Sequence, residues 1–228
     1  MIIILLISTI FLLIMKIVLK INLKDLKKLA DNQKLNEYTK KFPKNKEICQ
    51  KILKKLGNEK VEIEENSKSA TMYIAITNKI IIGDLKENYS RIQTIAHECL
   101  HSIQDKRLQK FHFIISNIYL IYFIVIIILE LINKLPSRNI YLIILLILGS
   151  IYITVRNYLE NDAMIKAKYI AKEYIEEERI LKKEEETELI NGYEKINKIG
   201  IPISNFQIWS DLIIKVIIFC IIDIIQSA

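Results

Sequence analysis

The chain has 228 residues, of which 51% are hydrophobic and 26% charged, with a formal net charge of +7. Neither a typical soluble enzyme nor a simple membrane bundle combines these fractions, so apolar and charged residues must be segregated along the chain. Five Gly and three Pro exclude collagen-like, linker-like and low-complexity proteins. Three scattered cysteines are too few for a disulfide framework and indicate a reducing compartment.

The chain opens with an apolar run over residues 1–19. This is close to the ~20 residues that a helix needs to cross the hydrocarbon of a bilayer. A secretory signal peptide would carry its basic residues before the run and a small-residue cleavage site after it, whereas here the lysines follow. We therefore expect a retained transmembrane anchor at 1–19.

Three further apolar runs follow. Residues 113–132 and 139–155 flank a short turn around Pro136 and should form a transmembrane hairpin. The last run, 212–226, is short and contains Lys215 and Asp223, so it could cross the membrane or lie along its surface. The sequence thus predicts three or four transmembrane helices.

The distribution of Lys and Arg sets the expected orientation. Fourteen lysines precede position 61 and nine basic residues lie between the third and fourth runs, whereas the hairpin turn has only Lys134 and Arg138. Segments 20–111 and 156–211 are therefore expected on the cytoplasmic side of a multi-pass protein of the cell membrane. The same lysines favour contact with anionic lipid, and without an aromatic–basic pattern they do not indicate nucleic acid.

Segment 20–111 reads as Lys-rich helices followed by a small antiparallel sheet. The helical part, 23–56, is broken at Phe42-Pro43, and the strand signals are 61–64, 71–77 and 79–83, the last two forming a hairpin through Asn78. Segment 156–211 should be a charged helix through Glu188 with a solvated acidic face, and Gly200-Ile-Pro202 should end the segment.

A helix is expected after the sheet. Asp84-Leu-Lys-Glu87 and Ser90-Arg-Ile-Gln93 are both possible capping boxes, and the helix should run to about Lys110. Its apolar stripe consists of Ile92, Ile95, Ala96, Cys99 and Ile103, with Cys99 as a small core residue.

This helix contains His97-Glu98-Cys99-Leu100-His101. Residues four apart share a helix face, so the two imidazoles can bind one Zn²⁺ with Glu98 beside it. Such a site lowers the pKa of a zinc-bound water to about 7, and Glu98 can accept its proton as general base. The chain has only three His, and two of them have this spacing, which favours a metal site. The alternative is an amphipathic helix with two surface His.

A third ligand must come from the same side of the membrane. The first carboxylates after the hairpin are Glu160 and Asp162, and the hairpin would return them to the level of His101. We expect Glu160 to be the third ligand and Asp162 to accept a hydrogen bond that orients an imidazole. A Glu160 that only caps a helix N-terminus is the alternative.

The segment Ile95-Ala-His-Glu-Cys-Leu-His-Ser-Ile-Gln104, followed by an apolar hairpin and Leu159-Glu-Asn-Asp-Ala163, resembles the bacterial membrane-embedded neutral zinc metallopeptidases. These are gluzincins whose motif reads His-Glu-x-x-His-x-x-Gln. The resemblance implies a mostly helical α+β membrane protein with a zincin-like cytoplasmic domain. It also implies His97, His101 and Glu160 as ligands and Glu98 as the catalytic base. Leu100 stands where such families often carry Gly.

Several residues keep open alternatives. His112 could be catalytic or simply polar at the membrane boundary. Either strand of the hairpin, 71–77 or 79–83, could be a sheet edge that pairs with a peptide substrate, or could only cover the motif helix. Candidates to stabilise an oxyanion are Tyr158, Tyr169, Tyr174 and Tyr193.

The sequence thus predicts a zinc metalloendopeptidase that holds one Zn²⁺ and hydrolyses polypeptides, membrane proteins among them. The alternatives are a non-catalytic membrane protein with a structural zinc site and a basic membrane-surface scaffold. The expected segments are an anchor at 1–19, a zincin-like domain at 20–111, a hairpin at 112–155, a helical segment supplying the third ligand at 156–211 and a C-terminal helix at 212–228.

Overall fold

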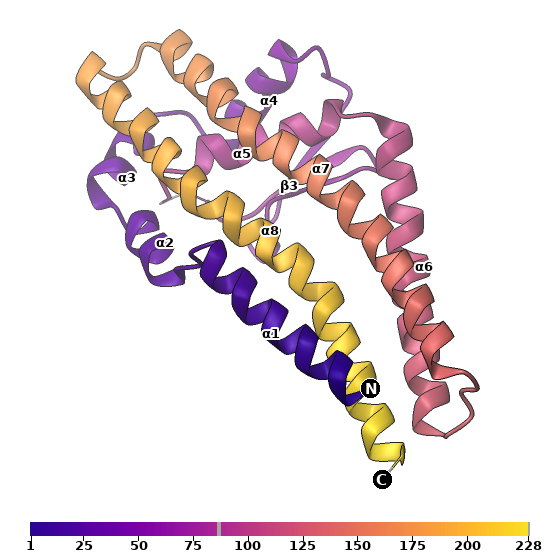
Figure 1. The fold of residues 1–228 in the computed structure, drawn as a ribbon. Helices are drawn as coiled ribbons and strands as arrows, with labels where there is room; N and C mark the ends of the chain where they lie inside the picture. The colour runs from indigo at the N-terminus through magenta and orange to yellow at the C-terminus, as the bar shows by residue number, and fades with distance from the viewer. Residues whose placement is uncertain (86–87, 228) are drawn as a thin grey trace. The chain divides into compact units, whose positions relative to one another are not determined.

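The computed structural model describes residues 1–85 and 88–227, and it is mostly helical (Figure 1). Contacts divide the chain into two compact units. We call the first the apolar unit; it comprises residues 1–21, 111–158 and those from Pro202 onward. The second, the polar unit, comprises residues 22–110 and 159–201.

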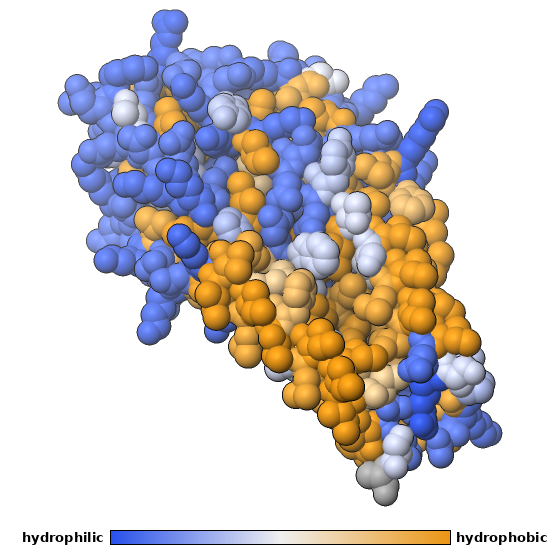
Figure 2. Space-filling view, viewed as in Figure 1, coloured by the Kyte–Doolittle hydropathy of each residue, from blue (hydrophilic) through white to orange (hydrophobic). Residues whose placement is uncertain are grey.

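The apolar unit consists of helices whose hydrophobic side chains are largely exposed, as expected for contact with lipid (Figure 2). Two helices are long and apolar enough to cross a membrane. A third span results if α1 (Ile2–Val18) and α2 (Leu23–Ala30) are counted as one bent span. The elements are α1 (Ile2–Val18), most of α6 (Lys106–Leu131) and parts of α7 (Arg138–Glu178) and α8 (Lys183–Ser227).

Two spans are fewer than the three or four predicted, and three are reached only if the bent pair is counted. Helix α1 has only 17 residues, fewer than the ~20 that span hydrocarbon without tilt or thinning. The run at 212–226 is the end of α8 and carries Lys215 and Asp223, which are costly at membrane depth. Both charges have partners: Lys215 pairs with Asp211, and Asp223 lies 3.1 Å from Arg138 Nε.

The polar unit begins with three short helices that agree with the expected Lys-rich helical segment. The predicted break at Phe42-Pro43 lies between the second and third of them, and Asn32 adds a further break by capping the second through the Leu35 N–H. The helices are α2 (Leu23–Ala30), α3 (Gln33–Lys40) and α4 (Asn45–Lys55).

The three predicted strands are present, but the sheet is mixed, so the prediction of an antiparallel sheet was wrong. The hairpin expected through Asn78 is confirmed, with Asn78 at a φ of 51°. The first strand crosses to the far side of the hairpin and lies parallel to its second strand. The strands are β1 (Glu62–Glu65), β2 (Met72–Ile74) and β3 (Lys79–Ile82), in the order β1-β3-β2.

Helix α5 (Arg91–Ile103) carries the predicted apolar stripe into the core. Ile92, Ile95, Ala96 and Cys99 are fully buried, whereas Ile103 is 45% exposed, against expectation. The helix ends at Ile103 and not near Lys110, because Gln104 adopts an extended conformation and Asp105 accepts the Arg107 N–H at the start of α6.

The helix start also differs from expectation. Ser90 is the N-cap, but its hydroxyl donates to Asn88 and makes no capping bond to the helix. The other predicted capping box, at 84–87, includes residues 86–87, which lie outside the described residues.

The charged segment after the hairpin is interrupted where it was expected to be continuous. Helix α7 ends at Glu178, and Arg179 has a φ of 52°. Helix α8 then continues through Gly200 and Pro202, but the boundary between the polar and apolar units lies at Pro202, where the sequence predicted the end of the charged segment. Several acids of this region pair with lysines of α4, of α3 and of the residue that follows α3: Glu188 with Lys34, Glu185 with Lys41, Glu178 with Lys51, and Glu173 and Glu177 with Lys55.

Arg91 joins the start of α5 to the turn between α3 and α4. Its side chain is buried, and its two terminal nitrogens donate to the carbonyls of Thr39, Phe42 and Pro43 and to Asn45 Oδ1, at 2.6–3.0 Å. A guanidinium can satisfy several carbonyls at once because its donors form a rigid fork. This network holds the first turn of the motif helix in place.

We predict that Arg91→Met lowers the free energy of unfolding by about 2–4 kcal/mol, because it leaves buried carbonyls without donors. Chemical denaturation of the detergent-solubilised protein would measure this. The control, Arg107→Met, removes an exposed arginine and should change stability by about 0.5 kcal/mol or less. Equal effects of the two substitutions would contradict the proposed role of Arg91.

Candidate metal centre

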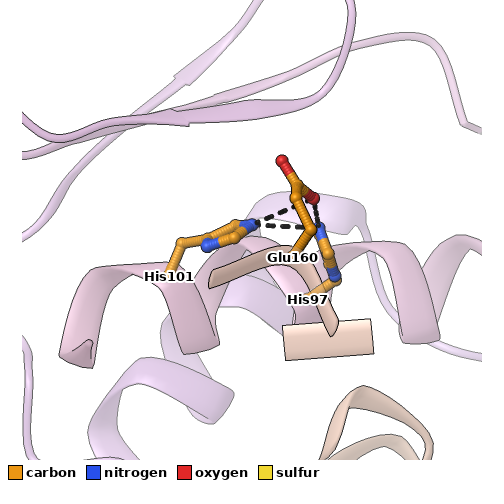
Figure 3. Close-up of side chains that lie close together, drawn as sticks. All are labelled: His97, His101 and Glu160. Atoms are coloured by element: carbon orange, nitrogen blue, oxygen red, sulfur yellow. Dashed lines mark hydrogen bonds and ion pairs between the residues drawn. The ribbon is translucent and has the colours of Figure 1, made fainter. Parts of the chain in front are cut away.

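Helix α5 presents two imidazoles from adjacent turns, and α7 brings a carboxylate to them. His97 Nε2 and His101 Nε2 lie 3.0 Å apart, and Glu160 Oε2 lies 3.5 Å from the first and 3.8 Å from the second (Figure 3). All three residues belong to the polar unit and are half-buried. The predicted ligands are therefore brought together by the fold, although 59 positions separate Glu160 from His101.

The spacing of these three atoms fits a small tetrahedral cation. Ligand atoms about 2.0–2.1 Å from a tetrahedral ion lie about 3.3 Å from one another. The observed separations of 3.0, 3.5 and 3.8 Å bracket that value. His97, His101 and Glu160 can therefore hold a metal ion, and two imidazoles with one carboxylate leave a fourth position open.

Glu160 reaches the site because it lies on the buried face of α7. Ala163, Ala167 and Ala171 follow it at three- and four-residue spacing, and each is at most 1% exposed. Their small side chains let α7 pack closely in the core, and Glu160 is one turn before the first of them. The alternative in which Glu160 caps a helix N-terminus is wrong, because α7 begins at Arg138.

Gln104 determines which nitrogen of His101 faces the site. Its Nε2 donates to Leu159 O at 2.8 Å and to Asp162 Oδ2 at 3.1 Å, so its Oε1 must be the atom that contacts His101 Nδ1 at 2.8 Å. An amide oxygen only accepts, so Nδ1 carries the proton and Nε2 presents its lone pair. A metal ligand requires this tautomer.

Asp162 acts on the imidazole through Gln104. Its carboxylate accepts the Gln104 amide and also pairs with Lys166 one turn later on α7. Sequence reasoning placed Asp162 in direct contact with an imidazole and gave Gln104 no role. The x-x-Gln that follows the second His was the available signal, but the helix end that turns Gln104 back toward His101 was not predicted.

Glu98 lies beside the ligands and is held by the sheet. Its side chain is 7% exposed, and its Oε2 accepts the backbone N–H of Tyr73 in β2 at 2.7 Å. Burial raises the pKa of the Glu98 carboxyl above its usual value, although the two imidazoles and the Tyr73 N–H oppose this rise. A carboxylate with a raised pKa is a better proton acceptor than an exposed one.

The charges of the three ligands complement a cation. Burial alone would raise the pKa of Glu160, but its contacts with His101 and His97 lower it well below its usual value. Burial likewise disfavours protonation of His101, but Glu160 and the neighbouring Glu98 raise its pKa. The carboxylates therefore favour positive charge at the imidazole nitrogens, where a metal ion would supply it.

The remaining residues of the motif face the core. Cys99 is fully buried as predicted, with its Sγ 3.6 Å from Cys49 Sγ, and Leu100 is also buried, so its side chain belongs to the hydrophobic core. Two of the tyrosines considered as oxyanion-stabilising residues, Tyr174 and Tyr193, lie in the same hydrophobic core, where they are at most 3% exposed. His112 belongs to the apolar unit, where its ring stacks on Tyr152.

A cavity of about 210 Å³ adjoins the metal site on the side of His97 and Glu160. Its walls come from the first turns of α5, from α7 and from α8, all within the polar unit. The site is thus open to a ligand larger than water.

We predict that Gln104→Met weakens binding of Zn²⁺ about 10–100-fold, because the imidazole loses the partner that fixes its tautomer. Competition with a chromophoric chelator would measure the affinity. Gln50→Met, at an exposed position of α4, is the control and should leave affinity unchanged. Asp162→Asn should have a smaller effect than Gln104→Met, and the reverse order would show that Asp162 is the more important partner.

No protein-family model, curated protein or solved structure matches the chain. What the protein does must therefore be inferred from its own residues: two imidazoles and a carboxylate arranged for a cation, with a buried glutamate beside them.

Proposed function

We propose that the protein is a zinc-dependent membrane metallopeptidase that hydrolyses peptide bonds in polypeptides, including membrane proteins. The observation that carries the proposal is the arrangement of His97, His101 and Glu160 around a position for one ion, with Glu98 next to it. Two ligands one helix turn apart, a third from another helix and an adjacent buried carboxylate are what metal-assisted hydrolysis requires.

The ligand set favours zinc over other divalent ions. Imidazole nitrogens suit zinc, copper, iron and nickel, whereas magnesium and calcium prefer sites made of oxygen atoms. The separations of 3.0–3.8 Å fit a tetrahedral ion, and tetrahedral geometry is the one zinc most often adopts in proteins. Zinc also needs no redox partner, in keeping with a hydrolytic reaction.

When bound, zinc would supply Lewis acidity that polarises a peptide carbonyl and makes water a better nucleophile. The residues of the chain supply the proton chemistry. Glu98 accepts a proton from the attacking water and passes it to the nitrogen of the leaving amine. The Tyr73 N–H holds one oxygen of Glu98, which leaves the other oxygen for this proton transfer. Gln104 keeps the proton of His101 on Nδ1, away from the reacting groups.

The sheet supports a polypeptide substrate. β2 is an edge strand, and its Tyr73 N–H points to Glu98 of the motif helix, so this edge faces the catalytic glutamate. Extended peptides commonly bind by adding to such an edge through main-chain hydrogen bonds. A substrate bound along β2 would have its backbone close to Glu98.

The two alternative functions are less well supported. A structural zinc site normally has four protein ligands. Here His97, His101 and Glu160 offer three, and the buried carboxylate beside them, Glu98, is not a ligand. For a basic surface scaffold, four lysines of segment 20–60 are already paired with acids of α7 and α8: Lys34, Lys41, Lys51 and Lys55.

For the membrane, we propose a multi-pass arrangement with the metal site on the cytoplasmic side. The two helices that can cross a bilayer, α6 and α7, are joined by a turn with few basic residues, and the flanking segments contain most of the Lys and Arg. This distribution is typical of cytoplasmic flanks and an external turn.

We predict that the purified protein binds about one Zn²⁺ and hydrolyses casein or a membrane-protein substrate. His101→Ala should abolish both zinc binding and hydrolysis, whereas Glu98→Gln should retain zinc and lose activity by about 100-fold or more. Metal analysis and a cleavage assay measure the two properties. His112→Ala, which removes the remaining histidine, is the control and should change neither. Unchanged zinc content in His101→Ala would eliminate the metal site.

The orientation has its own test. Ser137→Cys, in the turn between α6 and α7, should react with an impermeant thiol reagent added to intact cells. Gln50→Cys, exposed on α4, should react only after the cells are permeabilised. The three native cysteines are buried and should add little background. Labelling of Gln50→Cys alone from outside would place the metal site on the other side of the membrane.

A further inference from the structure

The cavity beside the metal site is lined partly by residues that have no part in the proposed catalysis. His97 and Glu160 form its edge nearest the ion position. Met164 and Ala167 from α7 and Ile196 from α8 supply apolar lining to the same cavity. A ligand held at the metal position would therefore have this cavity directly next to it.

Two amide side chains that line the cavity, Gln93 and Asn197, are hydrogen-bonded to each other. Gln93 Nε2 donates to Asn197 Oδ1 at 2.6 Å, and Asn197 Nδ2 donates to Met164 O at 3.0 Å. Both amides are almost fully buried, so their orientations are fixed by these bonds. They join α5, α7 and α8 into a rigid frame, and the surface left for a ligand is mainly that of the apolar side chains.

The volume matches a side chain of moderate size. A cavity of about 150 Å³ lined by aliphatic and aromatic residues is large enough to bind benzene. The cavity here measures about 210 Å³, so it can take the ring of Phe or the branched end of Leu. Gly and Ala would leave most of this space unfilled.

The charges of the cavity disfavour ionised side chains. Among the described residues that line the cavity, Glu160 is the only carboxylate, and it would repel Asp or Glu of a substrate. A Lys or Arg would lose its hydration on entering the cavity. It could not regain this energy through an ion pair with Glu160, because Glu160 would already bind the metal ion. An uncharged, apolar side chain meets neither cost.

We propose that this cavity is the specificity pocket of the protein and binds an apolar substrate side chain of Leu to Phe size next to the scissile bond. The inference rests on the proposed peptidase function. Ile196 and Met164 determine which side chain fits, because they are the large apolar side chains among the described residues that line the cavity. The substrate class is therefore polypeptides with a large apolar residue at the cleavage position.

The test is binding to the zinc-loaded Glu98→Gln variant, which separates recognition from catalysis. The probes are short peptide hydroxamates that differ only in the side chain adjacent to the metal-binding group: Ala, Leu, Phe, Glu or Lys. We expect Leu and Phe to bind about 10–100-fold more tightly than Ala, and Glu and Lys to bind no better than Ala.

A second substitution locates the effect. Ile196→Ala in the same background enlarges the pocket and should reduce the advantage of Leu over Ala about tenfold, with a smaller loss for Phe. Ile180→Ala is the matched control, because Ile180 is also partly buried at the edge of the core but does not line the cavity. It should leave the order and the size of the preferences unchanged.

The outcomes separate this inference from the proposed function. Zinc-loaded protein that binds all hydroxamates equally, or binds none, overturns the specificity pocket and leaves the metal site standing. Equal effects of Ile196→Ala and Ile180→Ala also overturn it. Protein that holds no zinc removes the proposed function, and the inference falls with it.

Discussion

Two imidazole nitrogens that lie 3.0 Å apart beside a carboxylate are the constraint on which the candidate metal site depends. With the His101 proton held on Nδ1, lone pairs and negative charge converge on one point, and such an arrangement is stable only when a cation or a proton lies among them. The buried face of α7 places Glu160 there, and the extended Gln104 fixes the imidazole. Each of these features is explained by a positive charge at the centre.

The same helices carry both the hydrophobic core and the site. One face of α5 buries Ile92, Ile95 and Cys99, and another presents the imidazoles, so tight packing of the first face fixes the position of the second. On α7 the alanine stripe has the same effect for Glu160. Ligand positions must be held to within a fraction of an ångström, and helices anchored in a core provide that precision better than loops do.

Short-range sequence patterns predicted much of the fold. They failed where the structure depends on contacts between segments that are far apart in the sequence. The break at Phe42-Pro43 and the β2–β3 hairpin follow from turn chemistry, which acts over a few residues. The direction of β1 depends on which side of the hairpin it joins, and no neighbouring residue specifies that. Pro202 is normally a helix breaker, yet α8 continues through it, because tertiary packing can outweigh the loss of one hydrogen bond.

By itself, the sequence determined the chemistry of the site: two histidines at helical spacing with a glutamate between them, a carboxylate shortly after an apolar hairpin, and apolar runs fit for a membrane. These are properties of residue type and spacing, which a helix converts directly into a shared face. Only the tertiary structure decided that Gln104 stands between Asp162 and His101, that Tyr73 holds Glu98, and that α8 closes a cavity beside Glu160. The reason is physical: each of these contacts joins segments that meet only when the core packs, and side-chain spacing along one segment carries no information about its partner in another.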